Sequence, residues 1–432
     1  MTTITVLDAI MGSGKTTYVI NMINSQHNKD LAEGFSNHNH QATKFLVVVP
    51  LLSEVDRFTN SCPDLRFKNP QPVQGKKLYH LEQLIEEGEN IVTTHALFGM
   101  LDRSIYEKLQ EKRYVLIIDE SMACVEMFNE LKLRDRKLLF DNGMVYIDKS
   151  TRRLCWNHET YSDYNGRFAD IRKLCDIGSL VVIKGKMLLW EFPSEFLTCF
   201  KQVLVCTYLF KGSLFYAYLR AEGFTIHMQT IRNGSLCEWD NGIADEETRS
   251  KLRSLITIYE GDMNRVGDAK ELSNPLSSTW YNKARQDQIK RLRSSTETFF
   301  ARVSKSPSKL NGWTAFSKVK SGLNGRGYTK GWIPNNAKAT NEYADKQAMA
   351  YLCNWFYHPV IKGYFYERGI EVDEDLYALS AMIQWIWRSR IRREEPIHVF
   401  IPSERMRSLL RAWLNPPMRQ SARPCGGLRE AA

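Results

Sequence analysis

The sequence lacks several features that mark common protein classes. It contains no uninterrupted apolar run of about 20 residues, the length that a membrane-spanning helix needs. Its first residues, Met-Thr-Thr-Ile-Thr, have neither the basic start nor the apolar stretch of a signal peptide. The nine cysteines stand singly, without a C-x-x-C pair, which excludes a zinc ribbon and a secreted disulfide framework. These absences predict a cytoplasmic protein with free thiols.

Length, composition and charge narrow the remaining classes. The 432 residues suit two domains of ordinary size, and contents of 43% hydrophobic and 25% charged residues are typical of a soluble globular protein. The formal net charge of +10 favours a polyanionic partner such as nucleic acid, because unlike charges attract at long range. A basic surface that serves only solubility is the alternative.

The segment from Ala9 to Thr17 reads A-I-M-G-S-G-K-T-T and lies between an apolar run and a helical pattern. Glycines at a strand-to-helix turn let consecutive backbone N–H groups approach phosphate oxygens, and the helix adds the positive end of its dipole. A lysine then reaches the β- and γ-phosphates, and a threonine hydroxyl helps to hold Mg²⁺. An ordinary glycine-rich turn would leave the lysine and threonine unexplained. The predicted nucleotide-binding residues are Gly12, Ser13, Gly14, Lys15, Thr16 and Thr17.

Apolar runs alternate with helical patterns along the first half of the chain. This alternation predicts an α/β fold with parallel strands covered by helices on both faces. The expected strands cover residues 3–7, 45–49, 90–93, 114–118 and 203–207.

Asp119 and Glu120 directly follow the most apolar of these strands. In open α/β sheets ligands bind at the carboxyl edge, where a phosphate-binding loop after the first strand also lies. Asp119 is therefore predicted to hold Mg²⁺, and Glu120 to orient or deprotonate the attacking water. An isolated pair of acids at a strand end is more often simply solvated, but the upstream loop makes a hydrolytic site the better explanation.

The pattern changes at three further places. Short strands with turn signals over about 131–200, including a hairpin of 180–183 with 187–190, indicate an insertion. A polar stretch with two Asn-Gly pairs places a domain boundary at 228/229. The second domain is expected over 229–414, with helices at 284–304, 343–357 and 376–393, and the final 415–432 as a disordered tail.

Gln384, Arg388 and Arg392 are spaced four apart within the last of these helices, so they are predicted to share one face. Guanidinium groups presented across a cleft could stabilise charge that develops on the γ-phosphate. A basic helix end that complements its own dipole is the alternative.

The motifs A-x-x-G-S-G-K-T, V-V-V-P, V-T-T-H, I-I-D-E-S, V-C-T-Y and Q-W-I-W-R-S-R occur in the order found in superfamily 2 helicases of the DEAD-like type. The sequence resembles these helicases, and most of all the compact helicase-like proteins of bacteriophages. The resemblance covers most of residues 3–414. It implies two RecA-like P-loop NTPase domains, the first with the hairpin-containing insertion, that bind ATP between them.

The resemblance also implies roles for single residues. Lys15, Thr16, Asp119 and Glu120 correspond to ATPase residues, and Gln384 and Arg388 to a sensor and an arginine finger. Thr207 corresponds to a residue that couples ATP to movement. The residues predicted to contact nucleic acid are Pro50, Thr94 and Thr340.

The last motif departs from its family pattern. Trp387 replaces a glycine, and Ile391 stands where the second arginine belongs, so Arg390 or Arg392 would have to take that role. The fourth motif reads D-E-S-M instead of D-E-A-D or D-E-A-H.

The sequence thus predicts an ATP- and Mg²⁺-dependent helicase or translocase that acts on nucleic acid, with DNA preferred over RNA, in the cytoplasm of a phage-infected host. A phage DNA-packaging ATPase shares both nucleotide motifs, and a P-loop nucleoside kinase or a protein that uses ATP only as a clamp are further alternatives. Other replication or recombination proteins are candidate partners.

Overall fold

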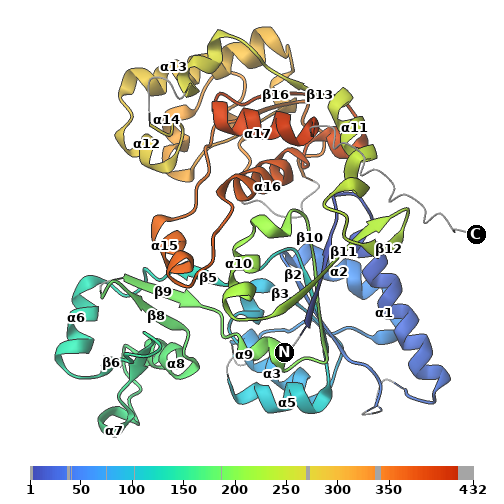
Figure 1. The fold of residues 1–432 in the computed structure, drawn as a ribbon, viewed down its shortest axis with the longest axis vertical. Coiled ribbons are helices and arrows are strands. Elements are labelled where there is room, and N and C mark those ends of the chain that lie inside the picture. The colour runs from blue at the N-terminus through green and yellow to red at the C-terminus, as the bar shows by residue number, and fades with distance from the viewer. Residues whose placement is uncertain are drawn as a thin grey trace, which may run out of the picture. The chain divides into compact units, whose positions relative to one another are not determined.

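The computed structural model describes residues 3–36, 39, 41–73, 75–101, 103–185, 187–268, 273–335 and 342–416. The chain forms two compact units, neither of which is continuous in sequence (Figure 1). The first consists of Met1–Asp245, Pro334–Tyr343 and Trp355–Arg388, and the second of Glu246–Ile333, Ala344–Asn354 and Ser389–Ala432. Within the described ranges, no helix is both long and apolar enough to cross a membrane.

The first unit is built on a seven-stranded sheet in the order β12-β11-β1-β10-β4-β2-β3. All neighbouring strands are parallel except β12, which pairs antiparallel with β11. The predicted strands are confirmed, because their runs of Val, Ile and Leu are buried on both faces, as in a covered parallel sheet. The bounds are β1 Thr3–Asp8, β2 Phe45–Val49, β3 Ile91–Thr94, β4 Val115–Asp119, β10 Gln202–Thr207, β11 Thr225–Arg232 and β12 Ser235–Glu238.

Helices cover both faces of this sheet, and alternate side chains of each strand enter two separate cores. Ile4 and Val6 of β1 join one core with helices α3, α5, α10 and α15, whereas Leu7 joins the other with α1 and α2. The bounds are α1 Lys15–Ala32, α2 Leu52–Ser61, α3 Lys77–Glu87, α4 His95–Phe98, α5 Tyr106–Lys112, α10 Leu214–Ala221, α15 Pro359–Glu367 and α16 Glu374–Ile386.

The polar stretch that predicted a domain boundary at 228/229 is a β-hairpin. Asn233 and Gly234 connect β11 to β12 with φ angles of 51° and 75°, the left-handed pair that a two-residue hairpin turn requires. The structure therefore groups residues 229–245 with the first unit, and 355–388 as well, where the sequence predicted one continuous second domain over 229–414.

The insertion has its own small core and two small sheets. Strand β9 pairs antiparallel with β5 and β8, and β6 pairs with β7, so the predicted hairpin of 180–183 with 187–190 is confirmed. Leu139, Trp156 and Phe168 pack in its core. The bounds are β5 Val125–Met127, α6 Leu133–Asp141, β6 Val145–Ile147, β7 Leu154–Trp156, α7 His158–Tyr161, α8 Ala169–Ile177, β8 Leu180–Ile183, β9 Met187–Glu191 and α9 Glu195–Thr198.

The second unit contains a four-stranded parallel sheet in the order β13-β16-β15-β14, packed around the buried Trp313 and Phe400. The helix predicted over 343–357 is wrong: its centre is strand β15, whose Ala-Met-Ala-Tyr run is fully buried between two strands. The bounds are β13 Ile256–Ile258, β14 Asn311–Thr314, β15 Ala348–Tyr351, β16 Ile397–Phe400, α11 Glu246–Leu255, α12 Ser278–Lys283, α13 Gln286–Thr298, α14 Lys320–Leu323 and α17 Glu404–Leu414.

Two parallel sheets with helices, and an insertion of hairpins in the first unit, confirm the predicted α/β fold class. The helix predicted over 284–304 is α13 followed by a π-helical turn, Phe299–Val303. Most of the predicted tail, 417–432, lies outside the described residues.

Candidate nucleotide site

Three neighbouring strands of the first unit end side by side with polar residues. Strand β10 lies between β1 and β4, and the register pairs Asp8 with Thr207 and Cys206 with Asp119. The loop after β1 is the predicted phosphate-binding loop, and Glu120 follows β4. Residues separated by more than 200 positions therefore meet at one carboxyl edge, where open α/β sheets bind ligands.

The loop from Ala9 to Gly14 has the backbone geometry of a phosphate cradle. Gly12 and Gly14 have φ angles of 82° and 91°, a region that favours glycine because it has no Cβ. Helix α1 begins at Lys15, and no side chain caps its first turn. The N–H groups of that turn have no intrahelical acceptor, so they can bind an anion.

Lys15 is held over this loop. Its Nζ donates hydrogen bonds to the carbonyl oxygens of Ala9, at 2.5 Å, and Ile10, at 3.1 Å. The ammonium group is thus positioned beside the predicted phosphate site. The Oγ of Ser13, in the same loop, is buried and has no hydrogen-bond partner within the described part of the chain.

Asp119, at the end of β4, has a carboxyl group whose ionisation is disfavoured. It keeps some surface exposure, but desolvation by the surrounding strands raises its pKa to about 7. The adjacent Glu120 raises the pKa further, and Lys15 opposes the shift. A divalent cation would compensate the negative charge of these two carboxylates.

Glu120 adopts a left-handed backbone conformation with φ of 65°, which is strained for a residue other than glycine. Its N–H donates to the carbonyl of Cys206 at 2.7 Å, and this hydrogen bond to β10 holds the conformation. Its Oε2 accepts hydrogen bonds from Thr207 Oγ1 at 3.2 Å and from Gln384 Nε2 at 3.5 Å. Ser121 Oγ donates to the same Thr207 hydroxyl at 3.3 Å. The structure therefore joins Glu120 to two residues that the sequence assigned to ATP coupling and sensing.

The predicted helical face of Gln384, Arg388 and Arg392 is wrong. Helix α16 ends at Ile386, because Ser389 takes an extended conformation and its hydroxyl caps the following 3-10 helix, Arg390–Arg393. Gln384 lies on α16 and Arg388 follows its end in the first unit, where it is buried. Arg392 lies in the second unit and is exposed.

The end of α16 contacts the glycine-rich loop after β1. A Cβ atom placed on Gly12 would lie 2.9 Å from the ring of Trp387, so only glycine fits beneath this indole. Trp387 is the residue that departs from the helicase pattern, and its ring packs against the loop that the pattern assigns to phosphate.

The three residues predicted to contact nucleic acid have different positions. Pro50 follows β2 and Thr94 is the last residue of β3; because these strands are neighbours in the sheet, both residues lie at the carboxyl edge. The Thr94 hydroxyl caps α4 by accepting the N–H of Leu97 at 3.4 Å. Thr340 lies outside the described residues.

Two acidic residues of the site were missed by the sequence analysis. Asp8 is buried at the end of β1, accepts the N–H groups of Leu209 at 2.8 Å and Phe210 at 3.2 Å, and has its pKa raised to about 6 by burial. Asp245 accepts the N–H of Ile10 at 3.4 Å. Asp8 could have been found as an acid at the end of the strand that precedes the loop, whereas no local pattern marks Asp245.

The donor set fits Mg²⁺. Carboxylate and hydroxyl oxygens are the ligands that this cation prefers, and Asp119, Glu120 and Thr16 supply them at one sheet edge. Burial is the main cause of the raised pKa of Asp119, and the nearby charge of Lys15 opposes it only in part.

A relative covers almost the whole chain. The uncharacterized protein YonV, derived from the SPbeta prophage of Bacillus subtilis (strain 168), is 37% identical over an alignment of 427 residues that covers 96% of this chain and 99% of YonV. The chain belongs to the YonV family. Residues 125–190 match the YonV middle domain, which coincides with the insertion. Residues 250–414 match the YonV C-terminal Rossmann-like domain.

Two solved structures align with most of this chain at low sequence identity. The apo structure of XPD aligns over 94% of this chain and 95% of its own, with 12% identity and a TM-score of 0.48. Xpd4 of S. tokodaii covers 95% of this chain and 94% of its own, with 10% identity and a TM-score of 0.38.

Proposed function

We propose that the chain hydrolyses ATP at the carboxyl edge of the first sheet and uses the hydrolysis to move on, or remodel, nucleic acid as a helicase or translocase. One observation carries the proposal. Glu120, two strands away from the phosphate-binding loop, is hydrogen-bonded by both Thr207 and Gln384. A carboxylate held in this way beside a loop that binds phosphates is arranged for hydrolysis of a nucleoside triphosphate.

The residues of this edge have separate roles in the proposal. The loop N–H groups and Lys15 bind the β- and γ-phosphates, and Lys15 also balances the charge that develops there. Glu120 accepts a proton from the attacking water or orients it. Mg²⁺, held by Thr16 and Asp119, would supply positive charge to the phosphate oxygens when bound.

Hydrogen bonds from Thr207 and Gln384 link the catalytic carboxylate to β10 and α16. When Glu120 gives up or accepts a proton, the strength of both hydrogen bonds changes, because bonds to a charged oxygen are stronger. The state of the nucleotide can therefore influence the position of α16. Arg388, buried just beyond α16, is the remaining candidate for a finger, and Arg392 is not proposed again because it does not share the face of Gln384.

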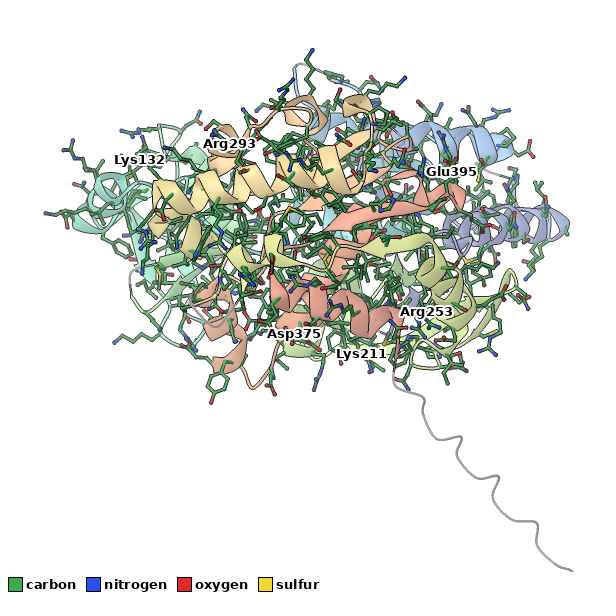
Figure 2. All side chains as sticks on the ribbon, turned by 90° about the horizontal axis from the view of Figure 1, so that it is seen from above. Lys132, Lys211, Arg253, Arg293, Asp375 and Glu395 are labelled. Carbon is green, nitrogen blue, oxygen red and sulfur yellow. The ribbon has the colours of Figure 1, made fainter. Side chains whose placement is uncertain are left out.

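The nucleic-acid part of the proposal is supported by charge. The chain has a net charge of +10, and Figure 2 labels Arg293 on α13, one of several basic residues in that part of the second unit. Of the aromatic residues nearby, Trp313 and Tyr328 are buried and belong to the core. Trp332 is partly exposed, and the Lys320 ammonium lies 3.8 Å from its ring centroid. The prophage origin of YonV supports a role in phage DNA metabolism within the host cytoplasm.

The decisive experiment measures the release of inorganic phosphate from Mg-ATP by the purified full chain, alone and with single-stranded DNA, duplex DNA or RNA. Hydrolysis that is stimulated by one of these nucleic acids and lost in Glu120→Gln, with ATP binding retained, supports the proposal. Equal hydrolysis in the variant, or none with any nucleic acid, overturns it. Transfer of phosphate to a nucleoside without release of inorganic phosphate would identify a kinase instead.

A further inference from the structure

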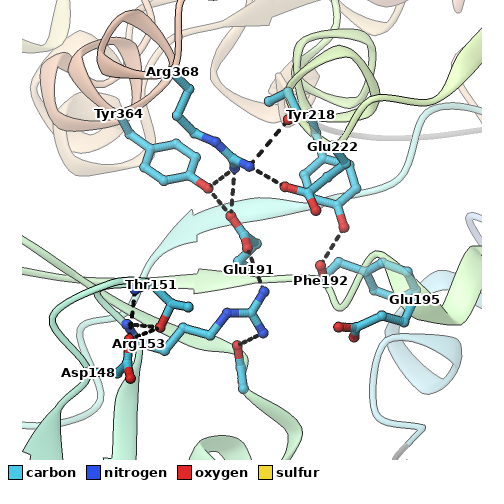
Figure 3. A network of polar contacts seen from close by, with 12 residues as sticks. Asp148, Thr151, Arg153, Glu191, Phe192, Glu195, Tyr218, Glu222, Tyr364 and Arg368 are labelled. Carbon is cyan, nitrogen blue, oxygen red and sulfur yellow. Dashed lines mark hydrogen bonds and ion pairs between the residues drawn. The ribbon is translucent and has the colours of Figure 1, made fainter.

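A buried polar junction joins the insertion to helix α15 of the first unit (Figure 3). Glu191, the last residue of β9, is 4% exposed, and its Oε2 accepts a hydrogen bond from the Tyr364 hydroxyl. Nη1 of Arg368 lies 3.3 Å from the same oxygen. The carboxylate therefore contacts two residues that lie more than 170 positions further along the chain.

Glu191 forms ion pairs with two arginines, Arg368 and Arg153. Arg368 also pairs with Glu222 and donates to the carbonyl of Ala221 at 3.4 Å, so it ties Glu191 to the end of α10. Arg153, within the insertion, places its Nη2 3.6 Å from Glu191 Oε1 and donates from Nη1 to the carbonyl of Gly178 at 2.8 Å. Glu191 thus lies between an arginine of the insertion and an arginine at the end of α15.

A second, more exposed ion pair links the same elements. Arg152, in the turn that leads into β7, places its Nη1 2.6 Å from Glu367 Oε2, on the last residue of α15. Two ion pairs therefore link the insertion to the C-terminal end of α15. Arg152 pairs with Glu367, the last residue of the helix, and Glu191 pairs with Arg368, which follows it. A single surface pair adds little, but a pair next to a buried network restricts the orientation of the helix.

Helix α15 is in turn braced against α16. Lys362 forms an ion pair with Glu374, the first residue of α16, and that carboxylate accepts the N–H of Tyr357 at 3.3 Å. The ring of Tyr357 stacks on Tyr377 with centroids 4.2 Å apart. A displacement of α15 must therefore move the first turn of α16.

One face of α16 lies along the candidate catalytic edge. At its start, a Cβ on Gly212 would lie 2.7 Å from the backbone of Leu376, so the helix packs directly on the loop after β10. One turn further, Ser380 Oγ donates to the carbonyl of Tyr208 at 3.4 Å. Gln384 then reaches Glu120, and Trp387 lies against Gly12. The contacts recur every three or four residues, which is one helical face.

We infer that Glu191 and Arg368 are positioning residues: they transmit the position of the insertion through α15 and α16 to Gln384, and so set the rate at which Glu120 acts. The inference rests on the proposed ATP hydrolysis. It gives the insertion, from β5 to the end of β9, a regulatory role at the candidate catalytic edge. In Glu191→Gln both arginine contacts lose the assistance of the carboxylate charge, so the link between the insertion and α15 is less well fixed in position, while Arg368 keeps its pair with Glu222.

The test compares Glu191→Gln with Asp135→Asn at about pH 8, where Glu191 is ionised. Asp135 forms an ion pair with Arg167 inside the insertion at 2.8 Å and provides the matched control. Glu191→Gln is expected to lower kcat about fivefold or more while the KM for ATP stays within about twofold, because the phosphate-binding loop is untouched. Asp135→Asn is expected to retain the wild-type kcat.

A double-mutant cycle with Gln384→Ala distinguishes positioning from a general loss of structure. If Glu191 acts through Gln384, the combined variant hydrolyses ATP no more slowly than Gln384→Ala alone. Multiplied losses in the combined variant, or a parallel rise of KM, would overturn the inference.

Hydrogen exchange tests the inference by a measurement that does not depend on ATP hydrolysis. Amides of residues 374–386 should exchange faster in Glu191→Gln than in the wild type or Asp135→Asn, and unchanged exchange there contradicts the inference. If the wild type hydrolyses no ATP, the proposed function fails, while this measurement still decides whether the junction positions α16. Should Glu191→Gln fail to fold, Gly212→Ala displaces the start of α16 by steric overlap alone and is expected to lower kcat in the same way.

Discussion

Both units are built on a sheet of mainly parallel strands, but the residues at the ends of these strands differ. In the first unit, β1, β10 and β4 end in Asp8, Thr207 and Asp119, and a glycine-rich loop with a lysine follows β1. In the second unit, β14, β15 and β16 end in the uncharged, buried residues Thr314, Tyr351 and Phe400. Parallel sheets of the same class therefore do not imply the same chemistry, which depends on the residues placed at the strand ends.

The described carboxyl groups whose pKa is raised by burial all lie in the first unit. Burial raises the pKa of Asp8 to about 6 and those of Asp119 and Glu191 to about 7, all in the first unit. In the second unit, hydrogen bonds from arginines lower the pKa values of Asp287 and Glu246, which are exposed. The first unit keeps desolvated carboxylates that a cation, a proton or an arginine must compensate, as functional sites often do.

The prediction with the largest expected effect concerns Lys15, the lysine that follows the glycine-rich loop of the first unit. Lys15→Ala is expected to lower the kcat/KM for ATP hydrolysis by roughly 10²- to 10³-fold, because one fixed charge at the phosphates is lost. Steady-state release of phosphate measures the effect. Lys29→Ala, at the exposed end of the same helix, is the control and should hydrolyse ATP like the wild type. Similar rates in both variants would remove the chemical distinction between the units.

A second test uses the pH dependence of stability. The pKa of Glu191 is about 7 in the folded protein and about 4.5 when exposed, so folding favours its protonated form. This contribution is complete below about pH 4.5 and is lost as the pH rises through about 7, for a total on the order of 3 kcal/mol. The difference in unfolding free energy between the wild type and Glu191→Gln, from denaturant titrations across this range, should show that slope. Parallel curves for the two proteins would mean that Glu191 titrates as if exposed.

A third test asks whether α16 completes the edge of the first unit. Gln384→Ala removes a hydrogen bond to a charged oxygen, and kcat is expected to fall about tenfold, with little change in ATP binding. Gln110→Ala, on α5, is the control, because Gln110 contacts Cys199 away from the site. An effect on binding alone would show that Gln384 contacts the nucleotide and does not act through Glu120.

The smallest expected effect concerns the second unit. Lys318 and Lys330 are two exposed basic residues of the second unit. If they contact a nucleic-acid strand, the double variant Lys318→Ala/Lys330→Ala should reduce the slope of log affinity against log salt by about 1.4 for single strands, which is roughly 0.7 for each lost phosphate contact. Affinity itself should fall only modestly, and Lys29→Ala should leave the slope unchanged. An unaltered slope in the double variant would place the strand elsewhere on the protein.

The sequence predicted those features that depend on neighbouring residues. The strands of the first sheet and the loop from Ala9 to Gly14 are recognisable because apolar runs and glycines act locally. Residues 343–357 were mistaken for a helix, since a short buried strand and a helix share the same apolar composition. The turn at Asn233–Gly234 is predictable from its two residues, but polarity does not tell which strand lies beside β1.

The candidate site likewise contains some features that the sequence predicts and others that it does not. The sequence by itself determined the glycine-rich loop after β1 and the acids at the end of β4, because positive φ angles at Gly12 and Gly14 and a buried strand that ends in Asp119 are local consequences of residue type. Only the tertiary structure decided that Gln384 meets Glu120 across 264 positions, that Trp387 lies on Gly12, and that Glu191 joins the insertion to α15. These contacts result from the packing of remote surfaces, whose free energy depends on the whole fold; a motif marked Gln384, but not the residue that it contacts.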